Sequence, residues 1–179
     1  MDITFDPFND RKARDIRNSL SAALVSDLVH GTAATVDQVA VAWTREGLPA
    51  PYRGYVRQTL ERYHRAANQI QSAGIQDPKK QALVLWNAGL FFELHELLET
   101  VWRVARQPEA RTGLKGLIQA AGVYVHQSRG DAAAARGLAL RARRNLLAGR
   151  DHLDFVADID LLIRSLEDPC RPPPTLLTA

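Results

Sequence analysis

Helical spacing of apolar residues runs along almost the whole chain of 179 residues, and this feature constrains the fold most. The spaced segments begin after capping residues such as Asp10 and Asp77, and they end at Gly or Pro. No segment shows the alternation of apolar and polar residues that is typical of a strand. We therefore predict an all-α helical bundle of about six to seven helices, with an antiparallel helix pair at its centre. The predicted helices cover approximately residues 10–30, 35–47, 52–73, 77–105, 109–129, 131–149 and 158–167.

The predicted helix over residues 77–105 is longer than most helices of globular proteins. We expect the segment 87–89, Asn-Ala-Gly, to mark a bend or a break in it. The helices group into an N-terminal extension, residues 1–76, and a bundle core, residues 77–150. Residues 151–179 are expected to hold a short helix and a Pro-rich tail that is extended or disordered.

Composition indicates the class of protein and the cellular compartment in which we expect the chain. The apolar fraction of 46% is enough for a sizeable core. Cys170 is the one cysteine, so the chain cannot form an internal disulfide. No apolar run approaches the length of a membrane span, and the first residues do not resemble a signal peptide. We therefore expect a cytoplasmic protein that does not associate with a membrane.

The stretch NAGLFFELHELLETVW, residues 87–102, combines a dense apolar sequence with Glu93, His95, Glu96 and Glu99. On a helix, His95 and Glu99 lie about 40° apart on one face, while leucines, Val101 and Trp102 cover the opposite arc. Aromatic neighbours are expected to desolvate the polar face partly, and partly desolvated charges need partners.

A second polar stripe occurs in the next predicted helix. Lys115, Gln119, Gly122 and His126 lie within about 60° of one another, and two helical glycines predict a close approach to a neighbouring helix. The short connection between the two helices predicts antiparallel packing, with His95 and Glu99 facing Gln119 and His126. The candidate polar site therefore comprises Glu93, His95, Glu96, Glu99, Trp102, Arg103, Lys115, Gln119 and His126.

Three interpretations of this cluster remain open from the sequence. A divalent metal site would use His95, Glu99 and His126, although neither the Glu-x-x-His pairs of di-iron bundles nor an HExxH motif is present. Acid–base chemistry would use a His tuned by a carboxylate, and no nucleophile motif accompanies it. In the favoured interpretation, a Glu–His–Gln network fixes how two helices dock in an interaction or structural module. The sequence thus leaves open whether the chain is an enzyme, and no other cofactor is predicted.

Arginines gather in the predicted helix 131–149. Residues 101–150 hold ten Lys and Arg but only Glu109 and Asp131 as acids, whereas residues 151–179 hold six acids. We favour pairing of the arginines with this acidic segment. The alternative is non-specific nucleic-acid binding through Arg136, Arg141, Arg143 and Arg144. The absence of aromatic residues between these arginines argues against it.

The two helical stretches also resemble a known family. NAGLFFELHELLETVWR followed by LKGLIQAAGVYVHQSRGD is similar to the domain of unknown function 309 family over roughly residues 80–150. The matching positions are Asn87, Gly89, Phe92, Glu93, His95, Glu96, Glu99, Trp102, Gly116, Leu117, Ile118, Gln119, His126 and Gly130. Two positions depart from the family pattern: Tyr124 comes one residue early, and Asp131 replaces a common Asn while keeping its capping ability.

The resemblance implies a small all-α prokaryotic bundle with no established activity. It supports the pairing of the two stripes without supplying a reaction. Taken together, the sequence predicts a module that binds a protein partner or a second copy of itself.

Overall fold

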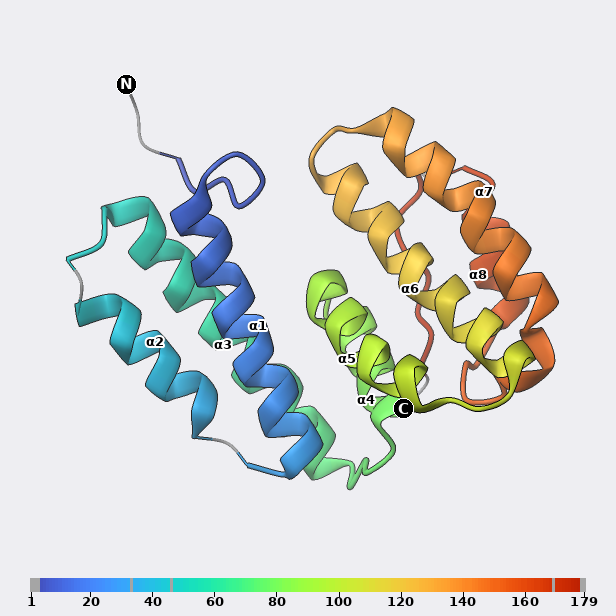
Figure 1. The fold of residues 1–179 in the computed structure, drawn as a ribbon, viewed down its shortest axis with the longest axis horizontal. Helices are drawn as coiled ribbons and strands as arrows, with labels where there is room; N and C mark the ends of the chain where they lie inside the picture. Colours follow the sequence, from blue (N-terminus) through green and yellow to red (C-terminus); the bar gives the residue numbers. More distant parts are fainter. Residues whose placement is uncertain (1–3, 33, 46, 169, 178–179) are drawn as a thin grey trace. The chain divides into compact units, whose positions relative to one another are not determined.

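The computed structural model describes residues 4–32, 34–45, 47–168 and 170–177, and these residues contain helices and no strand (Figure 1). The predicted all-α fold is thereby confirmed. The helices are α1 (Arg11–His30), α2 (Thr35–Arg45), α3 (Ala50–Ser72), α4 (Pro78–Asn87), α5 (Phe91–Val104), α6 (Pro108–Ser128), α7 (Ala132–Ala148) and α8 (Ile159–Ser165), with a 3-10 turn, η1 (Arg150–His152), between the last two. None of the described helices is long and apolar enough to cross a membrane.

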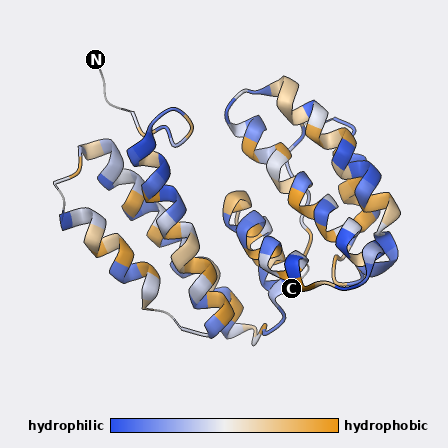
Figure 2. Cartoon of the chain, viewed as in Figure 1, coloured by the Kyte–Doolittle hydropathy of each residue, from blue (hydrophilic) through white to orange (hydrophobic). Residues whose placement is uncertain are grey.

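The chain divides into two compact units, residues 1–74 with α1 to α3 and residues 75–179 with α4 to α8. In both units hydrophobic and hydrophilic residues occupy different sides of the helices (Figure 2). The first unit has a buried carboxylate, Asp27, near the end of α1. Its oxygens accept hydrogen bonds from the Thr32 hydroxyl at 2.5 Å and the Val36 amide at 3.0 Å, so that Asp27 ties the start of α2 to α1.

The long predicted helix over residues 77–105 is two helices, α4 and α5, broken at the expected segment. Gly89 has a φ of 68°, in the left-handed region that glycine adopts without strain. The amide of Leu90 then bonds the carbonyl of Leu85 at 2.8 Å, which satisfies a carbonyl at the end of α4. Gly89 therefore lets α5 start in a new direction.

The closest helix pair in the second unit is α6 with α7, and its contacts run in antiparallel order. A Cβ added to Gly113 would lie 2.8 Å from the Gly149 carbonyl oxygen, and one added to Gly116 would lie 2.8 Å from the Leu146 amide nitrogen. The glycines thus permit a close approach, as predicted, but the neighbour is α7. The sequence predicts α5 as this neighbour, because the helical period does not identify the helix that a given face meets.

Residues 172–177 of the Pro-rich tail form neither helix nor strand, and they pack on the second unit. Leu176 is completely buried, and its carbonyl oxygen accepts a hydrogen bond from the Ala157 amide at 3.0 Å. Trp86, in the last turn of α4, donates its indole N–H to the Pro174 carbonyl oxygen at 2.7 Å. The tail is therefore a structural part of this unit.

Candidate functional site

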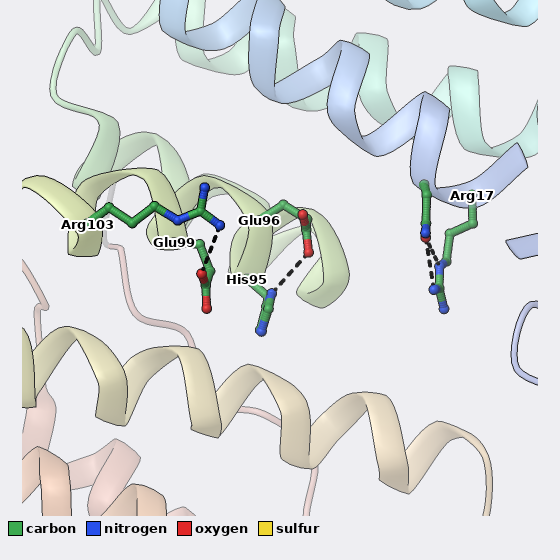
Figure 3. A network of polar contacts seen from close by, with 6 residues as sticks. Arg17, His95, Glu96, Glu99 and Arg103 are labelled. Carbon is green, nitrogen blue, oxygen red and sulfur yellow. Dashed lines mark hydrogen bonds and ion pairs between the residues drawn. The ribbon is translucent and has the colours of Figure 1, made fainter. Parts of the chain in front are cut away.

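Helix α5 separates the candidate cluster into a buried and an accessible part. Its core side carries Leu94, Leu97 and Leu98, and Glu93 lies among them with only 5% of its surface exposed. His95 and Glu99 lie on the accessible side, as the helical spacing predicts (Figure 3). Glu93 therefore does not share the polar face with which it was grouped from the sequence.

The polar face of α5 carries two local ion pairs (Figure 3). His95 Nδ1 lies 3.2 Å from Glu96 Oε1, and Glu99 Oε2 lies 3.4 Å from Arg103 Nη2. Between 32% and 71% of each of these side chains is exposed to solvent. Exposed pairs of this kind contribute little to the stability of the fold.

The second predicted stripe faces a different helix. Gln119 Oε1 accepts a hydrogen bond from Asn145 Nδ2 of α7 at 2.8 Å. His126 Nδ1 lies 3.4 Å from Asp131 Oδ2, at the turn between α6 and α7. None of the hydrogen bonds and ion pairs of His95 and Glu99 reaches either residue, so the predicted facing of the two stripes stays a prediction. The glycines of α6 lie against α7, and Gln119 makes its hydrogen bond on the same side.

The predicted metal ligands are separated by the same arrangement. His95 and Glu99 have partners on α5, whereas His126 has its partner at the start of α7. Within the described residues, no three His, Cys, Asp or Glu side chains come together in a group that could hold a metal ion. The ligand set proposed from the sequence is thus not assembled.

A shallow hollow between α5 and the start of α6 brings together two other members of the candidate site, Trp102 and Lys115. Its volume is about 360 Å³, and it is lined by Trp102, Pro108, Arg111, Thr112 and Lys115. The Arg111 guanidinium carbon lies 4.2 Å from the centre of the Trp102 ring, within the range of a cation–π interaction. Arg111 Nη1 also donates to the Ala105 carbonyl oxygen at 3.2 Å, so the guanidinium group has two contacts that hold it over the ring.

Arg111 was not recognised in the sequence as a site residue. Its spacing four residues before Lys115 was the available signal, since both side chains then lie on one face of α6. Two cationic side chains beside an aromatic ring favour a carboxylate or a phosphate group in the hollow.

The arginines of α7 are used in two ways. Arg143 Nη2 bonds Glu167 Oε1 at 2.7 Å, and Arg150 Nη2, just after α7, bonds Asp160 Oδ2 at 3.0 Å. The predicted pairing with the acidic C-terminal segment is confirmed for these two side chains. The other members of the nucleic-acid set, Arg136, Arg141 and Arg144, are exposed and form no ion pair with the described residues.

Three aromatic rings connect α4, α5 and α6. Tyr124 stacks on Phe91 with 5.1 Å between ring centres, and both rings meet the edge or face of Trp86. Burial raises the pKa of the Tyr124 hydroxyl, while its contact with the Ser165 hydroxyl at 3.4 Å lowers it in part. Tyr124 is therefore a core residue, and the packing of its ring against Phe91 and Trp86 explains why an aromatic residue stands at position 124.

Residues 80–138 match the sequence model of a family described as Domain of unknown function (DUF309). The matched segment runs from α4 into α7, and it includes α5, the hollow and the Gly89 break. The resemblance noted in the sequence is thereby confirmed for this segment. Asp131 caps α7 through the Ala134 amide at 3.1 Å, as expected for its position. No curated protein and no solved structure matches the chain.

Proposed function

We propose that the chain is an interaction module that binds a partner protein through the surface between α5 and α6. The stacking of Arg111 on Trp102 in the hollow is the observation that carries this proposal. Trp and Arg are the side chains that most often dominate the binding energy of protein interfaces. Here they are already ordered, so a partner would not have to immobilise them on binding.

The charges around the ring suggest what the partner presents. Arg111 and Lys115 both line the hollow, and Thr112 uses its hydroxyl to bond the Pro108 carbonyl oxygen at 2.8 Å. A partner carboxylate entering the hollow would meet two cations. The Glu99–Arg103 pair at the accessible side of α5 would form the polar rim of the same interface.

The two alternatives from the sequence have weaker support. A metal site would need His95, Glu99 and His126 to act together, and the partner of His126 lies at the turn before α7 while the other two have partners on α5. An acid–base activity would use His95 and its neighbour Glu96, and both of these side chains are substantially exposed to solvent. Nucleic-acid binding through α7 would rely on Arg136, Arg141 and Arg144, because Arg143 is already engaged by Glu167.

A site-specific photocrosslinking experiment tests the proposal. A benzoylphenylalanine is placed at Thr112 in the hollow, and at Arg164 on the exposed side of α8 as the control position. Crosslinking is carried out in cells that naturally produce the protein. We expect a defined product from position 112 alone, and its loss when Trp102→Ala and Arg111→Ala are added.

Two results would count against the proposal. One is the same crosslinked species from positions 112 and 164. The other is a product from position 112 that persists in the Trp102→Ala, Arg111→Ala protein. Either would show that the hollow does not select the partner. Thermal melting of each variant separates a lost contact from a lost fold, since Trp102 and Arg111 are only half-buried.

A further inference from the structure

Helix α7 exposes two leucines on the side that faces away from α6. Leu140 is 68% exposed and Leu147 is 50% exposed, and they are seven residues apart, close to two helical turns. The opposite side of α7 is buried through its alanines and Leu146. Large apolar side chains this accessible, aligned on one helix face, are typical of a surface that binds another protein.

Arginines flank the two leucines. Arg136 lies one turn before Leu140, and Arg144 lies between Leu140 and Leu147. Both are exposed and form no ion pair with the described residues, whereas Arg143 pairs with Glu167. Residues 132–148 contain no Asp or Glu, so the charge of this face is not balanced within the helix. We call Arg136, Leu140, Arg144 and Leu147 the Leu–Arg strip.

We propose that the Leu–Arg strip docks an amphipathic helix of a partner protein, with leucines that pack on Leu140 and Leu147 and acidic residues that meet Arg136 and Arg144. The row of alternating basic and apolar residues supports this choice. Two apolar positions at a seven-residue interval match the repeat with which one helix packs along another. The cations on either side select a partner helix that carries the opposite charge.

Other occupants fit the strip less well. If α7 packed on α7 of a second copy, arginines would face arginines, since the helix has no acid to offer. A nucleic acid would bring phosphates against two leucines, and no aromatic side chain stands in the strip to stack on a base. An anionic bilayer would gain only two apolar anchors from this face. The proposal does not depend on the α5–α6 surface, because the two surfaces share no residue.

Peptide binding to the full chain provides the test. The probe is a fluorescein-labelled helical peptide of about 20 residues with leucines seven residues apart and glutamates one turn from each. We expect fluorescence anisotropy at physiological salt to give a Kd on the order of 10 µM. The pair Leu140→Ser and Leu147→Ser, and separately the pair Arg136→Gln and Arg144→Gln, should each weaken binding by about tenfold or more.

Matched controls use exposed residues elsewhere in the same unit. Val104→Ser removes an apolar side chain that is 76% exposed on α5, and Arg106→Gln removes an exposed cation. Both variants should bind the probe like the unsubstituted chain. A scrambled peptide of equal composition tests whether the leucine spacing matters, and it should bind at least tenfold more weakly.

Several outcomes would overturn the proposal. Equal binding of the ordered and the scrambled peptide would reduce the interaction to charge alone. Binding that survives Leu140→Ser with Leu147→Ser would exclude the leucines. Tighter binding to a 20-base-pair DNA duplex, or to vesicles of phosphatidylserine and phosphatidylcholine, would assign the strip to a different anionic surface. Self-association that these leucine substitutions abolish would assign it to a second copy.

Discussion

The side-chain amide of Asn87 forms two hydrogen bonds with the backbone of Leu176 and Leu177. Asn87 Oδ1 accepts from the Leu176 amide at 3.0 Å, and Asn87 Nδ2 donates to the Leu177 carbonyl oxygen at 2.9 Å. The one side chain thus satisfies a donor and an acceptor of the tail backbone. Asn87 stands two residues before the Gly89 break, so the same short segment ends α4 and anchors a part of the chain almost ninety residues away.

Asn87→Ala should therefore release the tail. The substitution leaves the Leu176 amide without an acceptor, at a cost of about 1–3 kcal/mol in the free energy of unfolding. Limited digestion with chymotrypsin, which cleaves after leucine, should cut the variant after Leu176 at enzyme concentrations that leave the unsubstituted chain intact. Gln127→Ala is the control, because its bond to the Arg171 carbonyl oxygen is longer, 3.4 Å, and exposed. Equal protease resistance of the two variants would show that Asn87 does not hold the tail.

Gly116 lies at the contact between α6 and α7, and Gly137 lies away from it. Substitution of each glycine by alanine should therefore change the free energy of unfolding in opposite directions. In Gly116→Ala the new Cβ would lie 2.8 Å from the Leu146 backbone nitrogen, so the helices must separate, at a cost of about 1–3 kcal/mol. In Gly137→Ala the nearest atom is the end of the Arg141 side chain at 4.0 Å. That variant should be more stable by about 0.5–1 kcal/mol, because alanine restricts the unfolded chain and favours a helix.

Urea unfolding of the two glycine variants measures both effects under the same conditions. If Gly116→Ala stabilised the chain as Gly137→Ala does, the close approach of α6 and α7 would be refuted. An unchanged Gly137→Ala would only show that the helical propensity gain is offset locally, so the Gly116 result decides the packing.

The stability of the first unit should depend on acid through Asp27. Burial alone would raise the pKa of its carboxyl, but hydrogen bonds from Thr32, Thr35 and Val36 outweigh burial and hold this pKa below its ordinary value of 3.8. The unfolded chain therefore takes up the proton more readily. The resulting stabilisation is complete above the ordinary pKa, and it is lost as pH falls below 3.8 toward the folded-state pKa.

Asp27→Asn should lower the free energy of unfolding at neutral pH and flatten its decline in acid. Chemical unfolding between neutral pH and pH 3, followed by circular dichroism, measures both changes. Asp15→Asn is the control, since Asp15 is exposed and its ion pair with Arg11 is long, 3.9 Å. A steep acid dependence that is unchanged in Asp27→Asn would assign it to other carboxylates.

Local sequence signals predicted the helices well, and long-range contacts poorly. Asp77 and Asp131 cap their helices as expected. Gly89 separates α4 from α5 within the segment 87–89, where a bend or break was predicted. These features depend on a few neighbouring residues, so the sequence contains them directly. By contrast, the tail contact of Asn87 and the stacking of Arg111 on Trp102 depend on how separate helices meet.

The Gln119 side chain illustrates the limit most clearly. Helical spacing placed Gln119 and His126 on one stripe, but it could not show that this stripe faces α7. Asn145, the partner of Gln119, lies in α7, where only the arginines were considered as candidate site residues. Asn145 is half-buried and lies between Arg144 and Leu146, so its position gave no periodic signal that marked it as a partner.

His95→Ala and Gln119→Ala should separate the two halves of the network predicted from the sequence. His95 pairs with Glu96 at the surface, so its removal should change the free energy of unfolding by less than about 0.5 kcal/mol. Gln119→Ala leaves the Asn145 amide without its acceptor in the part-buried α6–α7 contact, which should cost about 1–3 kcal/mol.

Thermal melts with and without Zn²⁺ or Mn²⁺, together with elemental analysis of untagged protein, test whether the same residues bind a metal. Stabilisation by one metal that disappears in His95→Ala would show that α5 forms a metal site after all, because only a ligand specific to the folded state raises the melting temperature in this way.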